Sequence, residues 1–164
     1  EHLEQQMPGL SVRNLNLSGL DSVNLPVQQV LDITLHNHVD RVGNMISFNP
    51  FLTDGMRDMP FREETRKFPV DFAYPRSVKI VHVFEIPSGY QVAEIPKPLN
   101  LILPDKKGRF NCQITAEGNT LRLNAQFDVF ATVYDENEYE LLRQFYSQVI
   151  SRESEPVLLQ KTGI

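Results

Sequence analysis

One residue of this chain could serve as a thiol nucleophile, the single cysteine at position 112. A reactive thiolate normally occupies an exposed, electropositive position such as a helix N-terminus. Cys112 instead lies between Phe110 and Ile114 in an alternating apolar run, which is typical of a strand face that packs on a core. Because free cysteines are among the most buried residue types, we favour a structural cysteine over the nucleophile of a small hydrolase. A single cysteine also excludes an internal disulfide and a metal site of paired thiolates.

Two histidines, His36 and His38, could bind a metal ion together, since residues two apart on a strand point to the same side. Nothing else in the sequence supplies the remaining ligands of a zinc site. A polar strand edge that faces solvent explains the pair as well, and we favour it. His82 stands alone on an apolar face, which is typical of a hydrogen-bonded core histidine. With no phosphate-binding loop and no nucleophile elbow, we predict no catalytic residue, metal site or cofactor.

The remaining candidate is the segment from residue 49 to residue 75, which lacks a regular period and carries four prolines among aromatic and charged residues. A connection this long is uncommon in a compact domain unless it is functional or packed by its own side chains. Exposed aromatics beside arginine would suit a sugar, peptide or protein surface. Alternatively, the aromatics plug one end of the core while Arg66 and Asp71 fix the backbone, and we favour this interpretation. The candidate recognition or structural residues are Phe61, Arg66, Asp71, Phe72 and Tyr74.

Period-two alternation predicts the strands that must position these residues. It is strongest at residues 121–129, where apolar side chains alternate strictly with polar ones. Further strands are expected at residues 78–86, 99–103 and 110–116. Turn signals separate the runs, which indicates a mostly β domain, an antiparallel β-sandwich of immunoglobulin-like or related type.

Shorter runs predict further strands towards the N-terminus. Residues 14–18 alternate weakly, and residues 29–35 are expected to form a hairpin with residues 45–48. We assign residues 1–27 to a linker or edge strand and residues 28–164 to the β-sandwich domain.

A single helix is predicted near the C-terminus, before a last strand. Asp135 followed by Glu138 is a variant of the capping box, in which two side chains satisfy free backbone amides at the helix start. Apolar residues at helical spacing follow, so that one side of the helix packs on a sheet. They are Leu141, Leu142, Phe145, Val149 and Ile150. Residues 156–160 are expected to form the closing strand.

Length and charge exclude several classes of protein. A chain of 164 residues is long enough to bury one core. A net charge of -5 and a pI near 5.4 give no basic field for a phosphate backbone, which argues against nucleic acid as a partner. No apolar stretch is long enough to span a bilayer, so we predict no membrane span.

A set of short motifs resembles the uncharacterised C-terminal domain of bacterial transglutaminase-like proteins. The most specific of them is the stretch Arg66-Lys67-Phe68-Pro69-Val70-Asp71-Phe72. The others are Asn49-Pro50-Phe51, Pro60-Phe61, Ile86-Pro87-Ser88-Gly89-Tyr90, Ile95-Pro96 and the helix at residues 138–146. The resemblance spans most of the chain from about residue 28 onward.

This resemblance implies a non-catalytic accessory domain that follows a transglutaminase-like domain of the papain-like thiol type. The catalytic cysteine, histidine and aspartate of such proteins belong to the preceding domain, and no position here matches them. The implied partner is that catalytic domain, which the accessory domain would contact or supply with substrate. The implied location is extracytoplasmic, in the periplasm or cell envelope. An independent module that binds a carbohydrate or a peptide is the alternative.

Overall fold

The computed structural model describes residues 9–21, 24, 27–36 and 38–163. Its internal contacts divide the chain into two compact units, Glu1–Asp40 and Arg41–Ile164. Each unit is described by itself. The second holds every predicted site residue except the two neighbouring histidines.

The first unit contains a hairpin of β1 (Leu10–Ser18) and β2 (Gln28–Leu35), which pair antiparallel. The predicted hairpin between residues 29–35 and 45–48 is therefore wrong, although both strands exist. Alternation shows which face of a strand is apolar but does not identify its partner. Residues 28–35, which the sequence grouped with the chain that follows, lie in the first unit.

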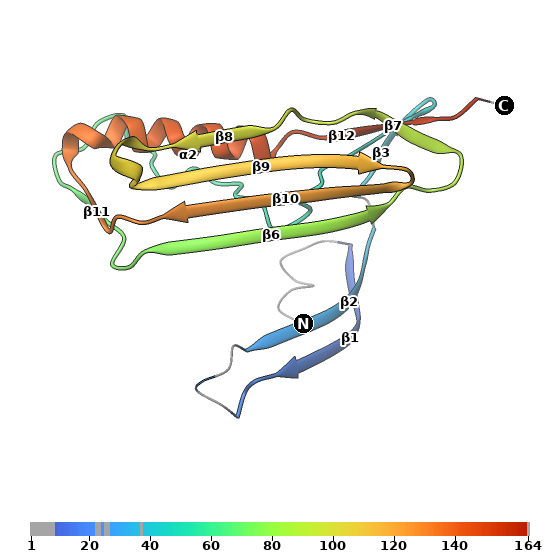
Figure 1. Cartoon of the computed structure of the whole chain (residues 1–164), viewed down its shortest axis with the longest axis horizontal. Helices are drawn as coiled ribbons and strands as arrows, with labels where there is room; N and C mark the ends of the chain where they lie inside the picture. The colour runs from blue at the N-terminus through green and yellow to red at the C-terminus, as the bar shows by residue number, and fades with distance from the viewer. Residues whose placement is uncertain (1–8, 22–23, 25–26, 37, 164) are drawn as a thin grey trace. The chain divides into compact units, whose positions relative to one another are not determined.

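The second unit contains two four-stranded sheets. The one with the longer strands, which we call the large sheet, is antiparallel and has the order β6-β10-β9-β8 (Figure 1). Their bounds are Arg76–Glu85 for β6, Leu99–Ile102 for β8, Gly108–Glu117 for β9 and Thr120–Val129 for β10. Alternating apolar residues of β9 and β10, such as Phe110 and Leu123, are buried on one face. On the other face β9 and β10 carry polar side chains, while β6 and β8 add the exposed apolar residues Val81, Val83 and Ile102, so the alternation divides core from solvent most clearly on β9 and β10.

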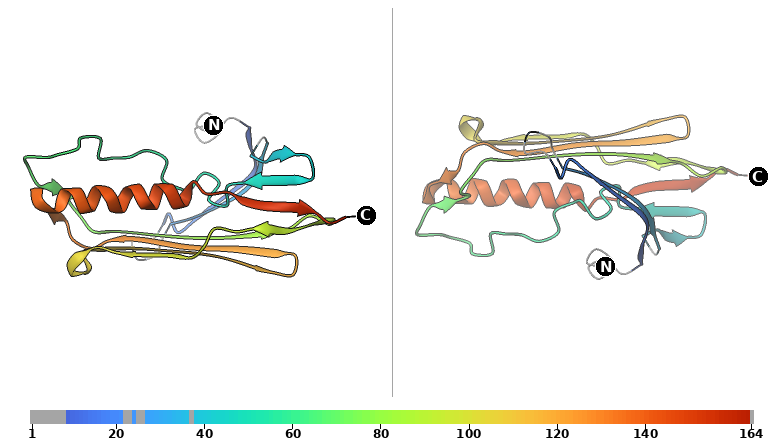
Figure 2. Two further views of the ribbon diagram at one scale, coloured as in Figure 1. Left: turned by 90° about the horizontal axis from the view of Figure 1, so that it is seen from above. Right: turned by 90° about the horizontal axis from the view of Figure 1, so that it is seen from below.

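The second layer consists of a helix at one end and a sheet at the other (Figure 2). The helix is α2 (Tyr139–Glu153), and the sheet has the order β3-β4-β12-β7. The strand bounds are Asp40–Val42 for β3, Met45–Phe48 for β4, Tyr90–Glu94 for β7 and Val157–Lys161 for β12. The chain passes from α2 into β12, which joins the two halves of the layer.

Short elements connect these layers. The strands β5 (Val70–Asp71) and β11 (Val133–Tyr134) pair with each other, and a 3-10 turn, η1 (Pro104–Lys106), precedes β9. A second 3-10 turn, η2 (Glu136–Glu138), leads into α2. There the backbone N–H of Asp135 donates to Oε2 of Glu138 at 2.9 Å, as the predicted capping box requires.

The predicted mostly β fold, with antiparallel sheets and one helix before the last strand, is confirmed. The core fills the space between the large sheet and the second layer, where α2 contributes Leu142, Phe145 and Val149. All three belong to the apolar side of the helix that the sequence predicted, whereas Leu141, which was predicted with them, is 46% exposed. Within the described part of the chain, no helix is both long and apolar enough to cross a membrane.

Candidate functional site

A cluster of aromatic rings closes one end of the core, and Phe61 lies at its centre. Phe61 is 6% exposed, and its ring meets the rings of Tyr146, Tyr139 and Phe72 at centroid distances of 4.9, 5.8 and 6.2 Å. All three contacts are edge-to-face, an arrangement that aromatic pairs favour. The long connection that carries Phe61 runs along α2 on the side away from the large sheet (Figure 2). Phe61 thus packs in the core.

Tyrosine hydroxyls fix the backbone around this cluster. Tyr139 donates to the carbonyl of Glu63 at 2.7 Å, and Tyr134 donates to the carbonyl of Lys107 at 2.8 Å. Burial raises the pKa of both Tyr134 and Tyr146 to about 12, so these hydroxyls keep their protons at neutral pH. The long connection is therefore held by both ring packing and hydrogen bonds.

Next to the buried cluster lies an exposed group that we call the platform, formed by Phe72, Tyr74 and Arg76. The Arg76 guanidinium lies 5.5 Å from the ring centroid of Tyr74 and 5.8 Å from that of Phe72. Tyr74 is 61% exposed and Phe72 is half-buried. Stacking of arginine on both rings is a cation–π arrangement that leaves the guanidinium N–H groups available to a partner.

A local turn orients the platform. Oδ1 of Asp71 accepts a hydrogen bond from the backbone N–H of Ala73 at 2.7 Å, and Ala73 has a left-handed φ of 61°. Asp71 thus stabilises this turn, whereas no hydrogen bond from Arg66 to the backbone is present among the described residues. Arg76 was missed by the sequence reasoning, although its spacing of two from Tyr74 at the start of a strand was a usable signal.

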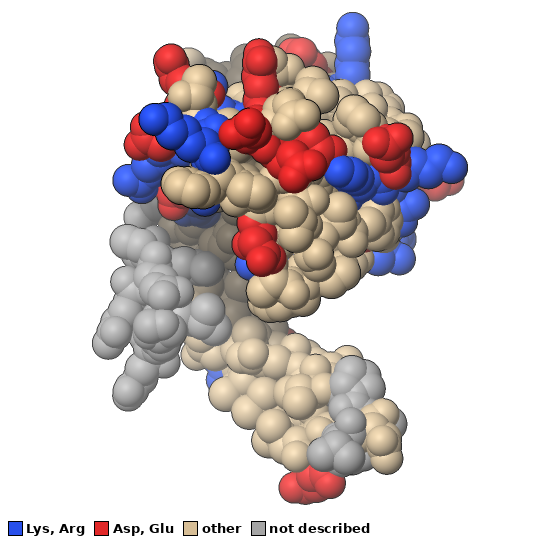
Figure 3. All heavy atoms as spheres, turned by 90° about the vertical axis from the view of Figure 1, so that its left-hand side faces the viewer, with Lys and Arg blue, Asp and Glu red and all other residues tan. Residues whose placement is uncertain are grey.

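Arg66 lies apart from the platform, on an open hollow of about 520 Å³ beside the start of α2. The hollow is also lined by Glu64, Thr65, Glu136, Asn137, Tyr139 and Glu140. Acidic and basic side chains are interspersed over this end of the second unit (Figure 3). The five predicted residues thus fall into three places: the ring cluster, the platform with its turn, and this hollow.

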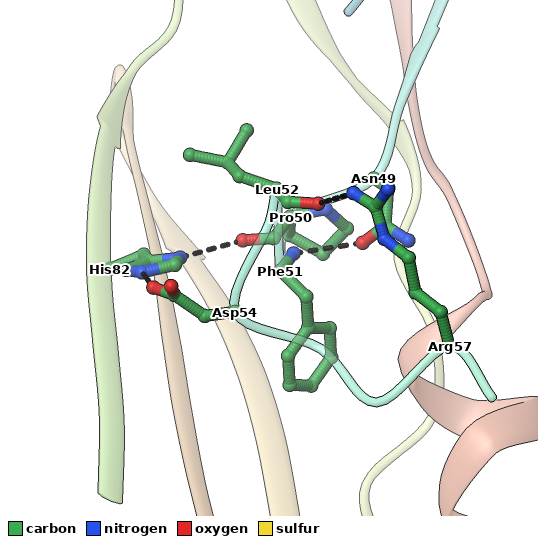
Figure 4. A network of polar contacts seen from close by, with 7 residues as sticks. All are labelled: Asn49, Pro50, Phe51, Leu52, Asp54, Arg57 and His82. Carbon is green, nitrogen blue, oxygen red and sulfur yellow. Dashed lines mark hydrogen bonds and ion pairs between the residues drawn. The ribbon is translucent and has the colours of Figure 1, made fainter. Parts of the chain in front are cut away.

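A polar network ties the start of the long connection to β6 (Figure 4). His82 Nδ1 lies 2.8 Å from the carbonyl oxygen of Pro50, and its Nε2 lies 2.9 Å from Oδ2 of Asp54. In the same loop, Arg57 donates to the carbonyl of Leu52 at 3.0 Å. His82 is hydrogen-bonded, as the sequence predicted, and its partners lie in a loop that local patterns could not place beside it.

The two neighbouring histidines form no such arrangement. His36 is exposed and His38 is half-buried. Across the residues that the structure describes, no three histidine, cysteine, aspartate or glutamate side chains gather where they could hold a metal ion.

Cys112 lies in the core on the inner face of β9. It is 2% exposed, and burial raises the pKa of its thiol to about 11. A nucleophilic cysteine requires the opposite shift, towards the thiolate. This placement agrees with the structural role that its apolar neighbours predicted.

Thiol labelling checks this placement. At about pH 8, a thiol of pKa 11 holds about 100-fold less thiolate than one of pKa 9, so a disulfide reagent should label folded Cys112 at least about 100-fold more slowly than the unfolded chain. The chain unfolded in guanidinium chloride is the control and should react at once. Rapid labelling of the folded protein would contradict the structural role and restore the hydrolase interpretation.

Comparison with known proteins identifies the fold and the family. No curated protein sequence matches the chain. The fold is similar to part of a solved structure from Parabacteroides distasonis ATCC 8503 that is described as "a putative protease", with a TM-score of 0.54 and 14% identity. The likeness covers 62% of this chain and 20% of that one, so the matched part corresponds to about a fifth of the neighbour's length. Residues 43–159 match the family DUF3858, so the chain belongs to this family, a domain of unknown function with a solved structure.

Proposed function

We propose that this chain is an accessory module that contacts a transglutaminase-like catalytic domain of the papain-like thiol type and helps it to recognise substrate. The resemblance of residues 66–72 supports this function, and so does a longer solved neighbour, described as "a putative protease", of which the likeness covers 20%. An extracytoplasmic location belongs to the same proposal.

The observation that carries the proposal is the platform. Its rings present flat apolar area on a rigid base, because Phe72 also packs edge-to-face on buried Tyr134 at 5.7 Å. Rigid aromatic and arginine side chains contribute most of the binding energy in many protein interfaces. Phe68, four residues before Phe72 in the chain, is 76% exposed.

A second candidate, a module that binds a glycan or peptide, is favoured by the polar face of the large sheet. Neighbouring strands align amide side chains there: Asn100 lies opposite Asn111, Asn111 opposite Gln126, and Gln113 opposite Asn124. Amides can both donate and accept hydrogen bonds, as sugar hydroxyls and extended peptides require.

Replacing Arg76 and Tyr74 with alanine tests the first proposal. In a polypeptide that joins this module to a transglutaminase-like domain, the double variant should weaken substrate use, measured as kcat/KM, by about 10- to 100-fold, because interface residues of this kind often contribute 1–3 kcal/mol. The matched control is Lys79→Ala with Glu85→Ala, two exposed charges of β6 outside the platform.

Two outcomes would contradict the accessory role. The first is an unchanged kcat/KM in the platform variant, and the second is unchanged folding and turnover when residues 41–164 are removed. Binding of isolated sugars or peptides that is lost on replacing Asn111 and Gln126, with no effect of the platform, would instead support the second candidate.

A further inference from the structure

A small cavity lies between the inner face of the large sheet and the loop that follows Pro50. Its volume is about 140 Å³, and its apolar walls come from β6, β9 and β10. The wall residues are Val78, Ile80, Phe110, Ala125 and Phe127. An apolar cavity of about 150 Å³ in another protein accepts benzene. The space can therefore hold the short hydrocarbon part of a ligand.

One carboxylate is buried beside these walls. Glu153, the last residue of α2, is 6% exposed and lines the cavity. Its Oε2 accepts a hydrogen bond from the backbone N–H of Met56 at 2.5 Å, a contact between residues 97 positions apart. Burial raises the pKa of Glu153, and the hydrogen bond from Met56 opposes this only in part.

No cation of the described residues forms an ion pair with this carboxylate. Among the described residues, Oε1 of Glu153 has no hydrogen-bond partner, and none of the ion pairs includes Glu153. A carboxylate this deeply buried, with one hydrogen bond and no ion pair, is unfavourable, and a ligand that supplies a positive donor would relieve this. The second carboxylate at the cavity, Asp54, is already bound by His82 at 2.9 Å (Figure 4).

We propose that this cavity binds a primary alkylammonium group, with its hydrocarbon chain on the apolar walls and its ammonium at Oε1 of Glu153. An ammonium has three donors and no acceptor, which suits a site whose free polar atom is an acceptor. A carboxylate or phosphate ligand would be repelled by Glu153, and a sugar would leave hydroxyls unpaired against the apolar walls. The ligand enters beside Val78, which is 48% exposed and marks the open side of the cavity.

The test is a titration followed by NMR on the methyl groups of Val78, Ile80 and Ala125. We expect 1-aminobutane to shift these signals and to bind at least about tenfold more tightly than 1-butanol, because a hydrogen bond to a charged group is stronger than a neutral one. Butyrate, which carries the same charge as Glu153, should not bind. Equal affinity for the amine and the alcohol, or no shift with either, would overturn the proposal.

A matched pair of variants assigns the effect to one carboxylate. Glu153→Gln keeps the side-chain shape and an acceptor for Met56, and it should weaken binding of 1-aminobutane about 10- to 100-fold. Glu117→Gln removes an exposed charge at the end of β9 and should leave binding unchanged. Amine binding that survives Glu153→Gln contradicts the proposal. If this variant does not fold, Val78→Phe decides, since a larger side chain at the exposed open side should block the amine.

The source of the amine requires one further comparison. A blocked Gly-Lys-Gly peptide that binds as tightly as 1-aminobutane would indicate the lysine side chain of a polypeptide. Binding of 1-aminobutane without binding of the peptide would indicate a small free amine. Both outcomes support the same site, and neither depends on whether the platform contacts a catalytic domain.

Discussion

Replacing Phe61 with alanine should lower the free energy of unfolding by about 3–5 kcal/mol, the range for deleting a buried phenylalanine. Phe61 is 6% exposed and touches three other aromatic rings, so its removal takes away apolar burial and the edge-to-face contacts together. The cavity that remains would lie between α2 and the long connection, which are fixed to each other there by Tyr139 and Glu63. Chemical denaturation followed by circular dichroism measures the loss.

The same stretch of chain offers a matched control in Phe68, which is 76% exposed. Phe68→Ala removes the same side chain from the surface, and its effect should stay within about 0.5 kcal/mol. A similar loss from both variants would show that Phe61 is not a core residue, and the structural interpretation of the long connection would then be wrong.

The sequence was sufficient to predict those features that depend only on residues close together in the chain. Strict alternation placed β10 at residues 121–129, where the strand is Thr120–Val129, because one face of that strand packs on the core and the other meets solvent. The helix start at Asp135 was found for a similar reason, since the capping box is contained within four residues. The core position of Cys112 also followed from its immediate neighbours.

Features that depend on distant contacts could not be predicted. The partner of β2 is one, because alternation is compatible with any neighbouring strand. The burial of the Glu153 carboxylate is another, since nothing in the local sequence shows that Met56 and the apolar wall of β10 surround it. The division of the second layer between a helix and a sheet likewise has no local signature.

The candidate site residues show the same difference between local patterns and distant contacts. Phe61 and Asp71 have the structural roles that the composition of their segment favoured, in ring packing and in a turn. Tyr74 forms the platform only together with Arg76, which lies between the irregular segment and the predicted strand at residues 78–86 and was not selected. Recognition surfaces of this type depend on exposure, and exposure is set by the packing of the whole domain rather than by the residues of one loop.

Replacing Asp128 with alanine is expected to have the other large effect, a loss of about 2–3 kcal/mol in the free energy of unfolding near neutral pH. Asp128 is 1% exposed, although it points to the polar face of the large sheet. Its oxygens accept hydrogen bonds from Ser77 Oγ at 2.6 Å, Arg109 Nε at 2.6 Å and Gln126 Nε2 at 3.3 Å. These donors join β6, β9 and β10, so the carboxylate ties three neighbouring strands together. Asp58→Ala, at an exposed aspartate in the long connection, is the control and should stay within about 0.5 kcal/mol.

The effect of Asp128 should depend on pH with a definite sign. Burial alone would raise the pKa of this carboxyl, but the hydrogen bonds from Ser77, Arg109 and Gln126 outweigh it and hold the pKa below its usual value of 3.8. A group whose pKa is lower in the folded state stabilises the fold above its unfolded pKa, and this contribution is lost as the pH falls through the folded pKa. The difference between wild type and Asp128→Ala should therefore be constant near neutral pH and shrink in acid below the usual aspartate pKa. Denaturation curves across that range measure it, and a difference that grows in acid would mean that the hydrogen bonds do not stabilise the ionised form.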